Sequence, residues 1–161
     1  MSNNKFSDIV ESWKSMKLWV KIWLFYLNAI FIFCIFFWGD HEVITWILVA
    51  YLGSGPYLMS IIIPSGGLSR VLGLAHIVPW TPLCIYILLL LITPKTLHVR
   101  HLDTSTSGSF IIYLVIFSAS IMISLCFDYY DVYRWLKGER YILGSKEAAA
   151  AGASQLKRVN L

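Results

Sequence analysis

The stretch FIIYLVIFSASIMISLCF, residues 110–127, decides the fold class. Its eighteen residues include no Asp, Glu, Lys or Arg, and a helix of about twenty apolar residues crosses the hydrocarbon core of a bilayer. The stretch lacks the alternating polarity of membrane β-barrel strands. Because backbone polar groups inside a bilayer must be satisfied within the segment itself, the stretch predicts a transmembrane helix.

Three further apolar stretches of similar length precede this one, and short links join them. The first stretch follows several lysines, as the core of a signal peptide does. However, it is bulky and aromatic and is not followed by small residues suited to cleavage, so we expect a retained helix. The sequence therefore predicts an all-α integral membrane bundle over residues 17–140. Its four transmembrane helices are expected at residues 18–38, 43–63, 71–92 and 110–127.

The composition of the whole chain agrees with a membrane protein. Hydrophobic residues make up 58% of the 161 residues, and charged residues make up 14%. Soluble domains average roughly 45–50% apolar and about 25% charged residues. This composition excludes an ordinary soluble domain and a nucleic-acid-binding module, so the first expected partner is the lipid bilayer and not nucleic acid.

The segments outside the bundle are short. In residues 1–16, apolar residues recur at spacings of three and four, which predicts an amphipathic helix on the inner membrane surface with Trp13 as its interfacial anchor. Residues 141–161 are expected to form a cytoplasmic tail.

The distribution of positive charge predicts the orientation of the bundle. If both termini lie on one side of the membrane, eleven of the thirteen Lys and Arg residues lie on that side, and Lys95 and Arg100 lie on the other. Positively charged residues accumulate on the cytoplasmic side of membrane proteins. Both termini are therefore expected in the cytoplasm.

Asn28 is the first polar residue inside an expected span. Polar side chains are costly in the membrane interior and often hydrogen-bond to another helix. We expect Asn28 to join two helices, which is a structural role. A role in lining a pathway is the alternative.

His76 and Thr81 lie in the third span, which also contains Pro79 and Pro82. Each proline removes a helical hydrogen bond and frees a carbonyl group one turn earlier. We expect His76 and Thr81 to satisfy such groups and His76 to face protein instead of lipid. The alternative for His76 is a proton carrier or a ligand, because intramembrane histidines serve both roles.

Charged residues concentrate at the end of the fourth span. Asp128, Asp131 and Arg134 follow one another at spacings of three, which places them on one helical face. The spacing predicts an acid–acid–base ladder at the inner interface, and Gly138 is expected to stop the helix. A salt-bridged helix end is the favoured interpretation, and a divalent-cation or lipid-headgroup site is the alternative.

A second group of candidate ligands lies on the expected outer side. His98 and His101 are three residues apart, and His41 belongs to the other outer loop. Together they have the residue types of a metal site, but no motif spacing supports one. No metal and no other cofactor is therefore expected.

Several of these residues also carry a resemblance. The stretch LGLAHI at residues 72–77, with Trp80 and the Pro82–Leu83 pair, and the later residues Asp128, Asp131 and Gly138 resemble a group of small four-helix bacterial inner-membrane proteins. The resemblance covers most of residues 17–140. It implies a bacterial inner membrane and four helices, and it implies no active site.

Three functions remain open on this basis. The leading hypothesis is a non-enzymatic membrane protein that works through helix contacts, as an oligomer or as an accessory subunit of a membrane complex. The second is an oligomeric channel or transporter, with His76 and the proline-containing helices lining its path. The third is an enzyme that acts on lipid headgroups through Asp128 and Asp131.

The charge distribution makes the orientation testable. A reporter fused to the C-terminus that is active only in the cytoplasm is expected to be active, and a reporter that is active only outside is expected to be silent. The opposite pattern would contradict the expected orientation.

Overall fold

The described part of the chain is helical. The computed structural model describes residues 9–10, 13–39, 41–65, 68–92 and 108–142. Its helices are Leu18–Phe33 (α2), Glu42–Ser65 (α3), Leu74–Ile92 (α4) and Gly108–Leu136 (α5), with short 3₁₀ helices at Cys34–Phe37 (η1) and Arg70–Gly73 (η2). Within these residues, extended pairing is limited to one isolated bridge between Ser69 and Ile142.

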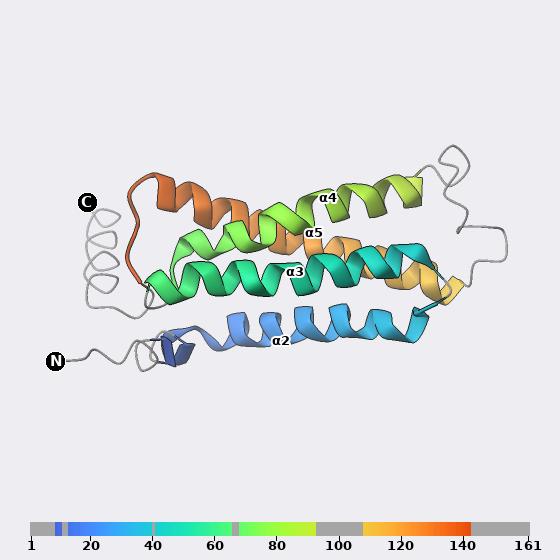
Figure 1. Ribbon diagram of the computed structural model, residues 1–161, viewed down its shortest axis with the longest axis horizontal. Coiled ribbons are helices and arrows are strands. Elements are labelled where there is room, and N and C mark those ends of the chain that lie inside the picture. Colours follow the sequence, from blue (N-terminus) through green and yellow to red (C-terminus); the bar gives the residue numbers. More distant parts are fainter. Residues whose placement is uncertain (1–8, 11–12, 40, 66–67, 93–107, 143–161) are drawn as a thin grey trace, which may run out of the picture.

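The four long helices lie side by side as a bundle (Figure 1). At one end, α2 and η2 begin and α3 and α5 end. We call this the charged end, because it contains the Lys and Arg residues of the described chain: Lys14, Lys17, Lys21, Arg70, Arg134, Lys137 and Arg140. At the opposite end, a tight turn joins η1 to α3.

The expected all-α bundle is confirmed for the described residues. Four helical segments are long and apolar enough to cross a membrane: Leu18–Phe37, Glu42–Ser65, Arg70–Ile92 and Gly108–Leu136. The apolar span expected at residues 110–127 lies within α5, and the helix continues nine residues beyond residue 127, to Leu136. The carboxylates in this extension bond to side chains of η2 and α4, which explains how the helix tolerates them.

Two predicted segments lie largely outside the described residues. Short helical stretches are present at residues 9–10 and 13–15, but most of the expected amphipathic helix at residues 1–16 is not described. Nearly all of the expected tail, residues 143–161, is not described either. Both segments stay predictions.

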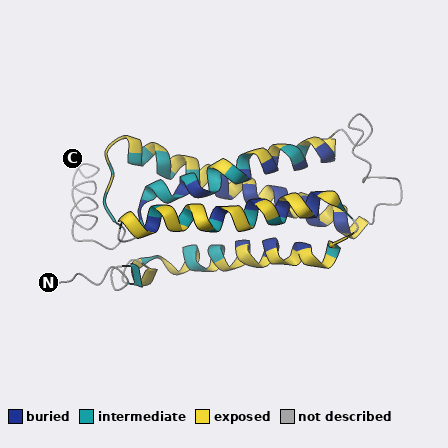
Figure 2. Cartoon of the chain, viewed as in Figure 1, coloured by how far each residue is buried: buried dark blue, intermediate teal, exposed yellow. Residues whose placement is uncertain are grey.

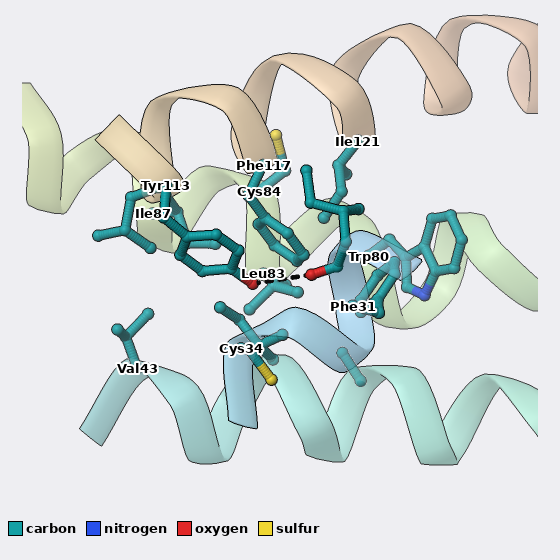
Figure 3. Packing of buried hydrophobic residues seen from close by; sticks show 14 of the residues in the cluster. Phe31, Cys34, Val43, Trp80, Leu83, Cys84, Ile87, Tyr113, Phe117 and Ile121 are labelled. Carbon is teal, nitrogen blue, oxygen red and sulfur yellow. Dashed lines mark hydrogen bonds between the residues drawn. The ribbon is translucent and has the colours of Figure 1, made fainter. Parts of the chain in front are cut away.

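The core of the bundle is aromatic and tightly packed. The ring of Phe31 lies 4.9 Å from Trp80 and 5.0 Å from Phe117 between ring centroids, so α2, α4 and α5 meet at this ring (Figure 3). The Tyr113 hydroxyl donates to the carbonyl of Ile30 at 3.1 Å. Figure 2 shows exposed residues along the outward sides of the helices. Many of these exposed residues are large and apolar, as expected of a surface that faces lipid.

The prolines do not interrupt the helices. Helix α3 continues through Pro56 and Pro64, and α4 continues through Pro79 and Pro82. Both proline-containing spans are therefore continuous helices in the structure.

Gly73 fixes how closely the start of α4 approaches α5. A Cβ atom at this position would lie 2.8 Å from the backbone oxygen of Asp128 and 3.1 Å from its Cα atom. Distances this short are not tolerated by backbone atoms, which cannot move aside as a flexible side chain can. Glycine is thus required here because two backbones are in contact.

We expect Gly73→Ala to lower the free energy of unfolding by about 1–3 kcal/mol, the usual cost of overpacking. Gly53→Ala is the matched control, because Gly53 has open space where its Cβ would lie. Titration of the purified protein with a denaturing detergent measures both effects. Equal effects of the two substitutions would contradict the close approach.

Candidate functional site

A histidine and a carboxylate face each other between α4 and α5, near the charged end. His76 Nδ1 lies 3.4 Å from both Oδ1 and Oδ2 of Asp128. The two side chains are 21% and 17% exposed, so the pair is mostly enclosed but accessible at its edge. Asp128 Oδ2 is buried and accepts no hydrogen bond from the described residues. The imidazole is thus the main polar contact of this carboxylate.

Aromatic residues position this pair. The ring of Trp80 stacks on the imidazole of His76, with centroids 4.3 Å apart and planes 18° apart. One residue further along α4, the Thr81 hydroxyl lies 3.0 Å from the Tyr129 hydroxyl of α5. These contacts hold the imidazole edge toward Asp128 and fix the register between the two helices.

Arg70 connects the start of the third span to the end of the fourth. Its Nη1 donates to Asp131 Oδ1, and its Nε lies 3.3 Å from Glu139 Oε2. The Arg70 side chain is only 14% exposed. A guanidinium withdrawn from water to this extent needs carboxylate partners, and here two different segments supply one each.

Glu139 joins a second arginine to the network. Arg134 donates from Nε to Glu139 Oε1 at 2.8 Å, and its Nη2 lies 2.7 Å from Glu139 Oε2. This is a bidentate contact between a guanidinium and a carboxylate. The Tyr141 hydroxyl also donates to Oε2, at 2.9 Å. The hydrogen bond from Arg134 is the main reason that the pKa of Glu139 lies below its ordinary value, and Tyr141 adds to it.

The segment after α5 is folded back so that Glu139 can make these contacts. Gly138 has a φ of +102°, a left-handed conformation that favours glycine. This confirms the expected helix stop just beyond Leu136. The bridge between Ser69 and Ile142 then holds the returning chain beside η2.

The expected ladder among Asp128, Asp131 and Arg134 is wrong in its pairing. Asp128 faces His76, Asp131 pairs with Arg70, and Arg134 pairs with Glu139. The helical spacing does place these residues on one face, but that face packs against η2 and α4. The neighbouring elements and the returning chain offer partners in better geometry than the next turn of the same helix.

The two carboxylates therefore serve different contacts. Asp128 faces His76 and Asp131 pairs with Arg70, so the arrangement gives no support to the headgroup enzyme. Among the described residues, no group of three or more His, Cys, Asp and Glu side chains is arranged to hold a metal ion.

Sequence reasoning missed Arg70 and Glu139 as members of this site. Arg70 counted only as a topology signal, and Glu139 lies beyond the expected helix stop. The available signal was that each is a charged residue directly at the end of an apolar helix. Which charges meet there depends on how the helix ends are packed.

His76 and Thr81 face protein, as expected, but their partners differ from the expected ones. Both bond to side chains of α5 instead of carbonyl groups freed by proline. The reason is the close approach at Gly73, which brings polar side chains of α5 within reach.

Asn28 lies elsewhere, between α2 and α3. The Tyr51 hydroxyl donates to Asn28 Oδ1 at 2.5 Å, and Asn28 Nδ2 donates to the carbonyl of Leu24 at 2.7 Å. The expected bond from Asn28 to another helix is confirmed. The structure does not bring Asn28 together with His76 and Thr81.

The candidate outer histidines give no metal site in the described residues. His41 stacks on Phe110, with ring centroids 3.7 Å apart and planes 9° apart. His98 and His101 lie outside the described residues.

Comparison with known proteins gives no match to a protein-family model, to a curated protein or to a solved structure. The resemblance to small bacterial inner-membrane proteins stays a prediction.

The pairing at the charged end is testable by double-mutant cycles. Arg70→Ala and Asp131→Ala should be less destabilising together than the sum of their separate effects, with a coupling of about 1 kcal/mol, because each single change strands a charged partner. The comparison cycle is Arg134→Ala with Asp131→Ala, for which we expect a smaller coupling. Detergent-induced unfolding measures both, and a larger coupling in the comparison cycle would contradict the observed pairing.

Proposed function

We propose that this chain is a multi-pass protein of a bacterial inner membrane that works through helix contacts, either with copies of itself or as an accessory subunit of a membrane complex. Both termini then lie in the cytoplasm. The gathering of the described Lys and Arg residues at the charged end supports this orientation. The proposed amphipathic segment would lie along the same surface, where Lys21 Nζ lies 5.9 Å from the centre of the Trp13 ring.

The observation that carries the proposal is an outward-facing polar pair in the middle of the bundle. Asn28 lies ten residues into α2, and Tyr51 lies nine residues into α3, so both lie near the centre of their spans. Their hydrogen bond is exposed at the surface of the bundle. Lipid tails offer no hydrogen bonds, so polar groups here favour a partner that does.

The pair retains unused hydrogen-bonding capacity. The Asn28 amide group has two N–H donors, and the carbonyl of Leu24 takes one of them. The Tyr51 hydroxyl uses its proton on Asn28 and keeps its lone pairs for a donor. Because the Tyr51 ring also stacks on the buried Phe31, with centroids 4.9 Å apart, this hydroxyl is held in place for a neighbouring helix.

The surface next to this pair is open to close contact. Gly55 follows Tyr51 by about one turn, and no atom lies within 4 Å of the place where its Cβ would lie. Small residues allow two transmembrane helices to approach closely. The α2–α3 surface thus combines a polar pair with room for a second helix.

A channel or transporter formed by several copies is the second candidate function. The contact between His76 and Asp128 favours it, because ionisable residues inside membrane spans commonly mark proton and ion pathways.

The helix-contact function predicts that Asn28→Leu weakens association. The expected loss is about 0.6 kcal/mol per interhelical hydrogen bond, or about threefold in the association constant. Energy transfer between labelled copies measures self-association, and co-purification from native membranes measures association with other subunits.

Ser60→Ala is the matched control for this experiment. Ser60 is an exposed polar residue of α3 that lies nine residues after Tyr51 and therefore on another face of the helix, and its hydroxyl bonds within α3, to the carbonyl of Tyr57. Association that is equally strong in the wild type, Asn28→Leu and Ser60→Ala would contradict the proposed contact.

A further inference from the structure

We propose that His76 and Asp128 form a binding site for one exchangeable proton at the charged end of the α4–α5 contact. The ligand is a proton taken from water. The site is independent of the α2–α3 surface, so its test does not depend on helix contacts. It uses the same pair that favours the second candidate function, and it holds whether or not the chain forms a channel.

The geometry of the pair suits a shared proton. His76 Nδ1 is equally distant from the two oxygens of Asp128, at 3.4 Å each. A proton on Nδ1 therefore faces the whole carboxylate. The stacked Trp80 ring keeps the imidazole from rotating out of this arrangement, and the backbone contact at Gly73 keeps α5 close to η2.

The arginines near Asp128 pair with other carboxylates, so His76 is the partner of the Asp128 carboxylate. From η2, Arg70 binds Asp131 and lies against Glu139. From the end of α5, Arg134 binds Glu139. The two arginines are thus matched by Asp131 and Glu139, and the side chain that faces Asp128 is His76 of α4.

Because both arginines are paired with other acids, binding one proton is favourable for the His76–Asp128 pair. Without one, Asp128 has an uncompensated negative charge in a mostly enclosed position, with another carboxylate one turn away. An unpaired buried charge is strongly unfavourable. With one proton the pair is neutral overall, whether the proton resides on the imidazole or on the carboxylate.

The binding step is a simple proton transfer. A hydronium ion gives its proton to the pair and leaves as water, so an O–H bond of the hydronium breaks and a bond to Nδ1 or to a carboxylate oxygen forms. The charge of the pair changes from −1 to zero. In this proposal the proton reaches the pair at the partly exposed edge of the imidazole, because Oδ2 itself is buried.

The inference is tested with full-length protein in lipid nanodiscs, with protons as the probe. Nuclear magnetic resonance of ¹⁵N-labelled histidine follows ring protonation across a pH series, and His76→Gln identifies the His76 signal. We expect Asp128→Asn to shift the pH range over which the His76 ring signal changes, because the substitution removes the charge of the carboxylate that faces the imidazole. Thr81→Val is the matched control, since it removes the neighbouring bond to Tyr129 without removing a charge.

Infrared spectra provide the second arm of the test, because they detect the shared proton when it resides on Asp128. A protonated-carboxyl band that is present in the wild type and absent in Asp128→Asn would also support the site. Equal binding of the His76 proton in both proteins, with no such band, would overturn the proposal.

A measurement on the wild type alone covers the case in which Asp128→Asn does not fold. Groups that share one proton titrate as a pair. The ¹³C signal of the Asp128 carboxyl group and the ¹⁵N signal of His76 should therefore change at the same pH. If the two signals change at different pH values, and neither signal responds when the other changes, the two groups do not form one site.

Discussion

The close contact between two backbones at Gly73 and Asp128 is the constraint on which the rest of the charged end depends. A side chain at position 73 would meet the backbone of α5 at 2.8 Å. With no side chain there, η2 and the first turn of α4 lie directly against α5. His76 and Thr81 then reach Asp128 and Tyr129, and Arg70 reaches Asp131. Interiors packed this closely do not deform gradually. The polar contacts between these helices therefore depend on the close packing at Gly73.

Charge neutralisation follows from this packing. Arg70 is largely withdrawn from water and is held between carboxylates from two segments, the last turns of α5 and the chain that returns after Gly138. Arg134 completes the arrangement through Glu139. Both arginines are matched by acids, so the network is nearly neutral although it lies among the positively charged residues of this end. The His76–Asp128 pair lies beside this network and has no arginine of its own.

The two polar features within the spans differ in the direction that they face. Asn28 and Tyr51 lie near the middle of the bundle, and their hydrogen bond is exposed at its surface. His76 and Asp128 lie between helices and are mostly enclosed. In a membrane an outward polar group favours contact with another helix, whereas an enclosed ionisable pair favours a role within the chain itself. This difference in placement is why the two features support separate proposals.

The sequence by itself determined the number of helices, the approximate bounds of their apolar parts and the helix stop at Gly138, because these depend on local hydropathy, helix length and backbone conformation. It also identified Asn28, His76 and Asp128 as polar residues that needed partners. The partners themselves were decided only by the tertiary structure. Arg70 and Asp131 are 61 residues apart, and His76 and Asp128 are 52 apart. No local spacing encodes such contacts. They arise because α4 and α5 pack at a distance that the absence of a side chain at Gly73 allows.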